Sequence, residues 1–263
     1  MMKKLGVILQ KFLNINIKVA FGFEFEFYLT DKFDVPLKDA ENFIEKIQRF
    51  FINENFFVYL DKEQEIGQLE ICSVATFEVI ENIKKWCVVL EKLKLHLQKE
   101  NIFLNQKAKP FFNKAGNGLH INISLHNSEN LENLFGLNDD FRHDIKNELL
   151  AYCIGGLLKN IEKNIDKYLF DESTILRIRN PDRNTPINFS WGHNNRTAMI
   201  RIPESLSHMK RIENRLPSSE NDLNEVVFLT LNGILEGIEN KISPPQCLYG
   251  LAFDSQYNLK SVL

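Results

Sequence analysis

The stretch Phe21-Gly22-Phe23-Glu24-Phe25-Glu26-Phe27-Tyr28-Leu29 alternates aromatic and acidic side chains. Successive side chains of a β-strand point to opposite faces, so the phenylalanines share one face and the two glutamates share the other. The aromatic face indicates a buried core. The two carboxylates would lie about 6.5–7 Å apart along the strand, an arrangement that is costly on a half-buried sheet unless a cation sits near both. Taken alone, the stretch also fits the solvated outer face of an antiparallel sheet.

The composition is that of a globular protein, with 44% hydrophobic and 25% charged residues among 263. A formal net charge of −3 gives no basic surface for nucleic acid. Four widely spaced cysteines without a C-x-x-C pair predict a reducing compartment and buried thiols, not a disulfide framework or a zinc site. Because no stretch approaches the roughly 18 apolar residues of a membrane span, we expect a cytoplasmic protein.

The apolar spacing predicts one domain of the α+β class, with antiparallel strands in a curved sheet and helices packed on one side. Residues 1–16 are predicted as an amphipathic lead-in, and 17–263 as the domain itself. Helices are expected at 37–53, 76–100, 139–169 and 222–242, and strands at 17–29, 56–60, 68–74, 119–125, 198–203 and 211–216.

Four of these strands each present polar side chains on one face. They are Glu24 with Glu26, Gln68 with Glu70, His120 with Asn122 and Ser124, and Arg211 with Glu213 and Arg215; Glu63 comes just before the second strand. Oxygen-rich ligand sets favour Mg²⁺ or Mn²⁺, and arginines suit phosphate or carboxylate oxygens. Two metal ions with arginines are typical of phosphoryl-transfer sites, and no G-x-x-x-x-G-K-[ST] loop offers another nucleotide holder.

These residues resemble the glutamine synthetase superfamily. The matching segments occur in the family's order: Gly22-Phe23-Glu24-Phe25-Glu26-Phe27, Gly67-Gln68-x-Glu70, Gly116-Asn117-Gly118-Leu119-His120-x-x-x-Ser124-Leu125, Ser190-Trp191-Gly192-x-x-Asn195-Arg196-x-Ala198-x-x-Arg201-Ile202-Pro203, Arg211-Ile212-Glu213-x-Arg215 and Gly237-Ile238-x-Asn240-Lys241-Ile242. The resemblance implies the family's catalytic domain, which joins a carboxylate to an amine at the expense of ATP.

The resemblance also implies a role for individual residues. Glu26, Glu63 and Glu70 match the ligands of a first metal ion, with Glu65 as the alternative to Glu63. Glu24, His120 and Glu213 match the ligands of a second. The other matched positions contact substrates: Arg196 and Arg201 would face the ATP phosphates and the acyl-phosphate transition state, Arg215 the transferred phosphoryl group and the substrate carboxylate, Ser124 the nucleotide, and Gly116 with Arg177 or Arg179 the substrate.

Departures from the family pattern concern the ammonia-using half of the site. About twenty residues precede Glu24, so the family's N-terminal β-grasp domain, with its aspartate, is expected to be missing. Asn184 stands where the family has a flap glutamate, Ala115 where it has a small amide contact, and Asn122 where it has a second histidine. The sequence therefore predicts a ligase that condenses a carboxylate such as glutamate with ammonia or, in preference, with another amine.

The alternative is a nucleotide- or metal-binding regulatory or partner module of the same fold. On either interpretation, a homo-oligomer or a partner protein would complete the site. The expected cofactors are two or more Mg²⁺ or Mn²⁺ ions, with ATP as co-substrate; neither nucleic acid nor a membrane is an expected partner.

Overall fold

The computed structural model describes residues 1–136 and 147–263. Its strands form a single sheet in the order β2-β3-β1-β5-β8-β7-β6, with β4 paired to the end of β1. The strands are β1 (Ile17–Thr30), β2 (Val58–Lys62), β3 (Gln68–Ser73), β4 (Phe103–Asn105), β5 (Leu119–Asn127), β6 (Trp191–His193), β7 (Ile200–Ile202) and β8 (Ile212–Asn214). β1, which carries the Phe/Glu alternation, therefore lies between β3 and β5 inside the sheet.

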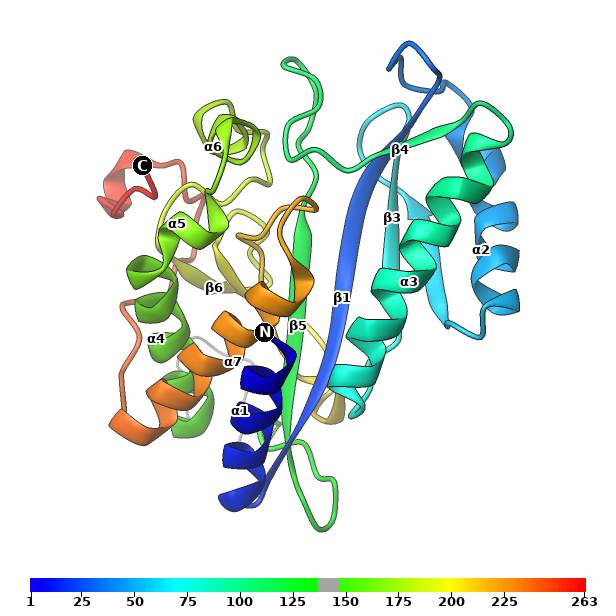
Figure 1. The fold of residues 1–263 in the computed structure, drawn as a ribbon. Coiled ribbons are helices and arrows are strands. Elements are labelled where there is room, and N and C mark those ends of the chain that lie inside the picture. Colours follow the sequence, from blue (N-terminus) through cyan, green and yellow to red (C-terminus); the bar gives the residue numbers. More distant parts are fainter. Residues whose placement is uncertain (137–146) are drawn as a thin grey trace.

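Helices cover one face of this sheet (Figure 1): α1, α3 and α7 lie over the strands, and α4 packs on α7. The helices are α1 (Met2–Asn14), α2 (Ile44–Asn53), α3 (Val79–Gln98), α4 (Glu148–Lys163), α5 (Ile165–Tyr168), α6 (Glu172–Arg179) and α7 (Leu223–Asn240), with short 3₁₀ turns η1 (Ala40–Phe43), η2 (Ser207–Met209) and η3 (Ser255–Tyr257). The opposite face of the sheet is left for polar side chains.

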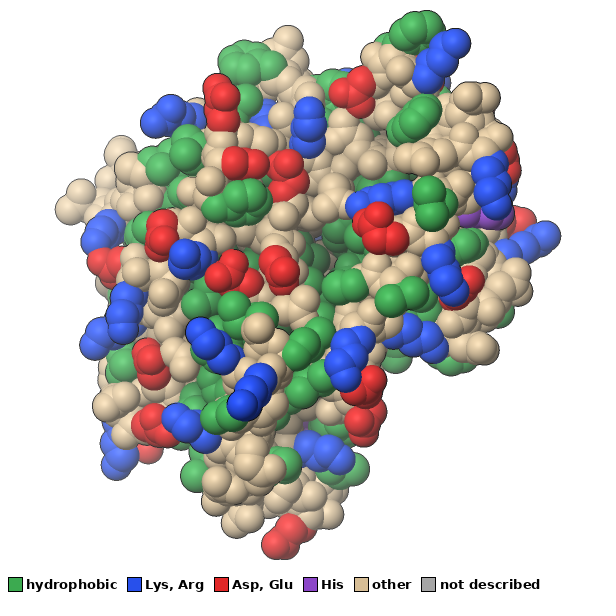
Figure 2. Space-filling view, in the orientation of Figure 1, with side chains coloured by type: hydrophobic (Ala, Val, Ile, Leu, Met, Phe, Trp, Pro, Cys, Tyr) green, Lys and Arg blue, Asp and Glu red, His purple; other side chains and the backbone are tan. Residues whose placement is uncertain are grey.

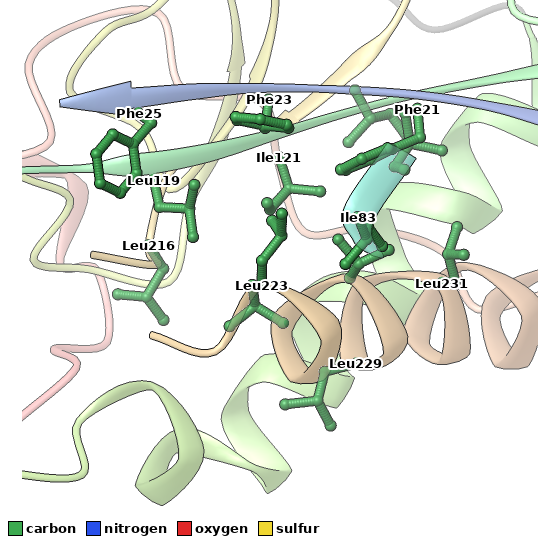
Figure 3. Close-up of a cluster of buried hydrophobic side chains, with 14 of the residues drawn as sticks. Phe21, Phe23, Phe25, Ile83, Leu119, Ile121, Leu216, Leu223, Leu229 and Leu231 are labelled. Carbon is green, nitrogen blue, oxygen red and sulfur yellow. The ribbon is translucent and has the colours of Figure 1, made fainter. Parts of the chain in front are cut away.

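The core fills the space between the sheet and these helices. Phe21, Phe23 and Phe25 of β1 are at most 2% exposed, and Figure 3 shows their rings with Leu119 and Ile121 of β5 on the side of the sheet that faces α7. This confirms the prediction that the aromatic face of the first strand is buried. The residues in between, Glu24 and Glu26 among them, consequently point to the other face.

α1 belongs to this core as well. Leu5, Ile8 and Phe12 recur at helical spacing and are buried in the same hydrophobic cluster as the β1 phenylalanines. The predicted boundary between a lead-in at 1–16 and a domain at 17–263 stays a prediction, but the helix of the lead-in shares the domain's core.

The sheet is mixed, whereas the sequence analysis predicted antiparallel pairing throughout. β6 and β7 run parallel, with Trp191 beside Ile200. Each of these strands has three residues, so the loop 194–199 is long enough to return to the start of β6. The amide of Ile200 donates to the carbonyl of Ser190 at 3.0 Å and closes this return.

Other helices and strands begin or end a few residues away from their predicted bounds. The helix predicted at 37–53 begins as the 3₁₀ turn η1, and the strand predicted at 56–60 is displaced to 58–62. Part of the helix predicted at 139–169 lies outside the described residues, and the rest is α4 and α5. The sequence analysis missed β4 and β6, which have only three residues each, and α6. α6 begins at a capping box in which the Asp171 carboxylate accepts from the Thr174 amide at 2.8 Å.

The prediction of buried thiols holds for one cysteine only. Cys153 is buried in α4, whereas Cys87 is exposed on α3, because its position falls at the edge of the apolar stripe of that helix. All four cysteines are free.

α4 and α7 meet backbone to backbone. A Cβ atom added to Gly156 would lie 2.3 Å from the carbonyl oxygen of Gly233 and 2.3 Å from the Cα of Gly237. No flexible side chain stands at these points that could move aside, so the contact requires glycine.

Replacing Gly156 with alanine should therefore lower the free energy of unfolding by about 1–3 kcal/mol or more, as expected for overpacking. Urea denaturation would measure the loss. Gly6→Ala is the matched control, because its Cβ would meet only Ile80 Cδ1 at 3.7 Å. That variant should gain about 0.5–1 kcal/mol from helix propensity. Equal stabilities of the two variants would contradict the packing argument.

On the helix-covered face, Lys and Arg side chains are interspersed with Asp and Glu (Figure 2). Among the described residues, no helix combines the length and apolar character needed to cross a membrane.

Candidate active site

The polar face of the sheet brings together carboxylates from strands far apart in the sequence. In the β1–β5 register Glu24 lies opposite His120, and in the β1–β3 register Glu26 lies opposite Glu70. Five of the six predicted metal ligands form two groups whose donor atoms lie within 4.8 Å of one another: Glu24 with His120 and Glu213, and Glu26 with Glu70 and His120. The two groups meet at the imidazole.

Glu24 is held as an anion. His120 Nδ1 donates to Glu24 Oε2 at 3.0 Å, and the Asn122 amide donates to Glu24 Oε1 at 3.0 Å. Burial alone would raise the pKa of Glu24, but the hydrogen bond and the charge of His120 outweigh it and hold this pKa at about 2. The same contact raises the pKa of His120 against the opposing effect of its burial.

Glu26 and Glu70 form a like-charge pair directly across two strands, an arrangement that destabilises a sheet. The Gly118 amide donates to Glu26 Oε2 at 2.5 Å, and the Cys72 thiol donates to Glu70 Oε2 at 3.1 Å. Burial, followed by the charges of Glu24 and Glu26, raises the pKa of Glu70 to about 8. A divalent cation between these oxygens would remove the repulsion, and oxygen donors with one imidazole suit Mg²⁺ or Mn²⁺.

Glu63, the sixth predicted ligand, lies beside these two groups but is in neither. Burial and the charge of Glu26 raise the pKa of Glu63, which places it within electrostatic reach of the site. Glu65, its alternative, forms an ion pair with Lys114 at 3.3 Å. Of the two residues, Glu63 is therefore the one available to a cation.

Two arginines converge on Glu213, which is 1% exposed. Arg201 Nη1 donates to Glu213 Oε2 at 2.8 Å, and Arg215 Nε donates to Glu213 Oε1 at 2.9 Å. The Nε of Arg201 is buried and has no hydrogen-bond partner in the described part of the chain. A buried, unpaired N–H beside a candidate metal group is a ready donor for a ligand oxygen.

The two predicted substrate-binding residues outside the strands lie together. Arg177 is 5% exposed on α6, and its Cγ lies 3.0 Å from where a Cβ of Gly116 would be. Arg177 Nη1 donates to the carbonyl of Leu216 at 2.8 Å, and its buried Nε has no partner among residues 1–136 and 147–263. Arg179, two residues further along the helix, is exposed. The geometry thus favours Arg177 over Arg179.

The other two predicted nucleotide contacts besides Arg201 are Ser124 on β5 and Arg196 in the loop between β6 and β7. Ser124 Oγ is 2.9 Å from His126 Nε2 on β5. Arg196 is exposed in the loop between β6 and β7, and its carbonyl accepts from Arg215 Nη1. Asn122, in place of the family's second histidine, links Glu24 to Arg211, whose Nε donates to Asn122 Oδ1 at 3.0 Å.

The sequence analysis missed Asp182 and Cys72. Asp182 Oδ2 accepts from the Gly116 amide at 3.1 Å, and although burial would raise its pKa, the charge of Arg177 lowers it. Its position after Asn180-Pro181 indicates a turn, and nothing local shows that it faces a distant glycine. Cys72 follows Glu70 at the spacing that shares a strand face, a signal that could have placed it there.

Comparison with known proteins gives a family for this arrangement. The description "Glutamine synthetase, catalytic domain" matches residues 33–258. Gamma-glutamylputrescine synthetase PuuA of Escherichia coli (strain K12) is 30% identical over 176 residues, which cover 67% of this chain and 36% of that protein. A glutamine synthetase of Pyrococcus horikoshii is 25% identical over 265 residues, 90% of this chain and 55% of that protein. The chain thus spans between a third and just over half of these relatives.

Solved structures share the fold. A GmaS/ADP complex superposes with a TM-score of 0.80 at 20% identity, covering 99% of this chain and 64% of that one. The glutamine synthetase of Plasmodium falciparum gives a TM-score of 0.78 at 23% identity, covering 92% and 56%. From the family match over residues 33–258 and the agreement of the fold, we conclude that this chain belongs to the glutamine synthetase family and contains its catalytic domain.

Proposed function

We propose that this chain is an ATP-dependent ligase that forms an amide from a carboxylate, such as glutamate, and an amine. A carboxylate oxygen attacks the γ-phosphorus of ATP and ADP leaves; the amine nitrogen then attacks the acyl carbon, phosphate leaves, and the nitrogen loses a proton. The observation that carries the proposal is one cluster of side chains. In it the two groups of candidate metal ligands share His120, and Arg201 and Arg215 both donate to Glu213.

The charge distribution supports in-line transfer of a phosphoryl group. Mg²⁺ or Mn²⁺ bound by Glu24, Glu26, Glu70, His120 and Glu213, with Glu63 adjacent, would neutralise the phosphate oxygens. Arg201 offers its unpaired Nε to an oxygen of the transferred group, and Arg215 is fixed beside it by Glu213. Side chains held in advance where charge develops are the main source of rate enhancement in such reactions.

Arg177 and Gly116 are proposed to hold the donor acid. The unpaired Nε of Arg177 is a donor for a carboxylate, and burial favours that pairing because the guanidinium is poorly solvated. Arg177 is also close enough to Glu26 for its charge to be felt there. The donor acid would therefore lie between α6 and the two groups of candidate metal ligands.

The amine is proposed not to be ammonia. Asn184, at the position of the family's flap glutamate, carries a neutral amide that donates to Gln64 Oε1 at 3.3 Å. A neutral pair is a poor site for ammonium, which needs carboxylates. The similarity to a relative named gamma-glutamylputrescine synthetase supports an amine other than ammonia within this family.

Phosphate release from ATP, with Mg²⁺ or Mn²⁺, against a panel of carboxylic acids and amines tests the proposal. Release should require one acid and one amine together. Glu26→Ala should lower it by about 10²–10³-fold, because the variant lacks a ligand of the cation that would neutralise the phosphate oxygens. Glu81→Ala is the control: this side chain is 69% exposed on α3, and its loss should leave the rate unchanged.

Nucleotide binding without release for any pair would overturn the ligase proposal and favour a regulatory or partner module of the same fold. The same samples would show, by sedimentation, whether a homo-oligomer forms. Activity that appears only on adding a cell fraction would indicate that a partner protein completes the site. A cytoplasmic location remains part of the proposal.

A further inference from the structure

A cavity of about 630 Å³ opens beside the arginines of the site. Four segments far apart in the sequence line it: Gln64, residues 183–184, residues 193–197 and residues 248–251. It adjoins the catalytic groups directly. The carbonyls of Asn184 and Arg196 both accept from Arg215 Nη1, and Asn194 Oδ1 accepts from Arg201 Nη2 at 2.7 Å.

The C-terminal segment forms a fixed wall of this cavity. The Leu248 amide donates to the carbonyl of Trp191 at 2.9 Å, Asn195 Nδ2 donates to the carbonyl of Gly250 at 2.7 Å, and the Ala252 amide donates to Thr197 Oγ1 at 2.9 Å. Leu248 is buried against Ala198. The wall therefore presents apolar surface, including the half-exposed Leu251, to whatever enters.

The charge of the lining is positive. Arg183 and Arg196 are exposed, and neither guanidinium has a hydrogen bond or ion pair with another described residue. None of the lining residues is Asp or Glu. Among the carboxylates near the lining, Asp182 accepts from the amides of Gly116 and Asn184, Glu204 accepts from Asn194, and Glu63, next to Gln64, is assigned above to the metal cation.

Size and charge together indicate the ligand. The cavity is about twenty times the roughly 30 Å³ that a water-sized molecule occupies in the liquid. Its lining includes Asn184 and Arg196, whose carbonyls bond Arg215, and Gln64, which is next to Glu63 in the sequence, so a molecule inside it would lie beside the proposed transfer site. A second ammonium group on that molecule would face guanidiniums and no free carboxylate, whereas an anionic group would find a partner.

We infer that this cavity binds the acceptor amine, and that the acceptor carries a carboxylate or similar anionic group, with Arg183 as its specificity-determining residue. The inference rests on the proposed function. Arg196 is the arginine assigned above to ATP phosphates, so Arg183, which adjoins Asn184 at the mouth of the cavity, is left for the acceptor. We therefore expect a diamine to be a poor substrate of this chain, although the name of the E. coli relative contains that of a diamine, putrescine.

Three amines with three carbon atoms each test the inference: β-alanine, propylamine and 1,3-diaminopropane, each with ATP, Mg²⁺ and glutamate as the donor acid. Phosphate release should give the highest kcat/KM for β-alanine and the lowest for the diamine, with steps on the order of tenfold for one charge contact. Arg183→Glu should reverse the order of β-alanine and the diamine. Arg49→Glu, an exposed charge reversal on α2, should leave the order unchanged.

Hydroxylamine tests the proposed function separately from the inferred acceptor site, because it traps the acyl phosphate as a hydroxamate without needing that site. Hydroxamate formation combined with any other order of the three amines, or with an order that Arg183→Glu does not change, would overturn the inference alone. Absence of hydroxamate would overturn the proposed function and the inference with it. Arg183 is exposed, so its variants should keep the fold, which circular dichroism would verify.

Discussion

Replacing Glu213 with alanine is expected to abolish ATP turnover and to lower the free energy of unfolding by about 3–5 kcal/mol. The carboxylate is 1% exposed and bonds both Arg201 and Arg215. Its loss leaves two guanidiniums close together with no counter-charge, in addition to removing a ligand from the group with Glu24 and His120. Urea denaturation and phosphate release would measure the two effects.

Glu213→Gln keeps the volume and one acceptor, so it separates charge from packing. We expect it to be about as inactive as Glu213→Ala but to recover part of the lost stability. Arg201→Ala with Glu213→Ala forms a double-mutant cycle, in which the second change should cost far less than it does alone. Additive losses would show that the ion pair is not the source of the stability.

Replacing Glu70 with glutamine is expected to raise the free energy of unfolding of the metal-free protein, whereas Glu213→Ala lowers it. Glu70 faces Glu26 across two strands, and burial with the charges of Glu24 and Glu26 raises its pKa to about 8. The neutral amide removes the repulsion. The same change removes a ligand oxygen, so the stabilisation that Mg²⁺ or Mn²⁺ gives the wild-type chain should fall by several kcal/mol at saturating ion.

The sign of the pH dependence follows from the raised pKa. In the unfolded chain Glu70 loses its proton near its ordinary value of 4.5, whereas in the folded chain it keeps it to about 8. Between these values the folded state binds more protons, so its stability falls as pH rises, and the full penalty applies above about pH 8. Unfolding of chelator-treated protein at pH 6 and 8.5 should show a larger loss in the wild type than in Glu70→Gln, in which only the raised pKa values of His120 and Glu63 still contribute.

The strand faces could be predicted from the sequence because a period of two is a local property. Alternation along Phe21–Leu29 and Leu119–Leu125 was enough to put Glu24 and His120 on the same side of the sheet. Which strands are neighbours in the sheet was not predicted, because a period of two carries no information about the pairing partner. The parallel return of β7 beside β6 had no local signal, since three residues are too few to show a pattern.

The remaining parts of the site depend on segments that meet only in the folded chain. Asp182 becomes a partner of Gly116 because α6 carries the loop after it toward the glycine turn. The cavity beside Arg215 has contributions from residues 64, 183 and 251. No window of sequence contains these residues together, so neither residue spacing nor composition could reveal them.

The wall of that cavity has a consequence for how the protein is made. Residues 248–251 leave the ribosome after every strand of the sheet, at about 5–20 residues per second. The candidate metal ligands and the arginines bonded to Glu213 can therefore assemble on a nascent chain in which residues 248–251 have not yet docked. The cavity wall is complete only when this last segment docks on Trp191, so the acceptor cavity is the last part of the candidate site to form.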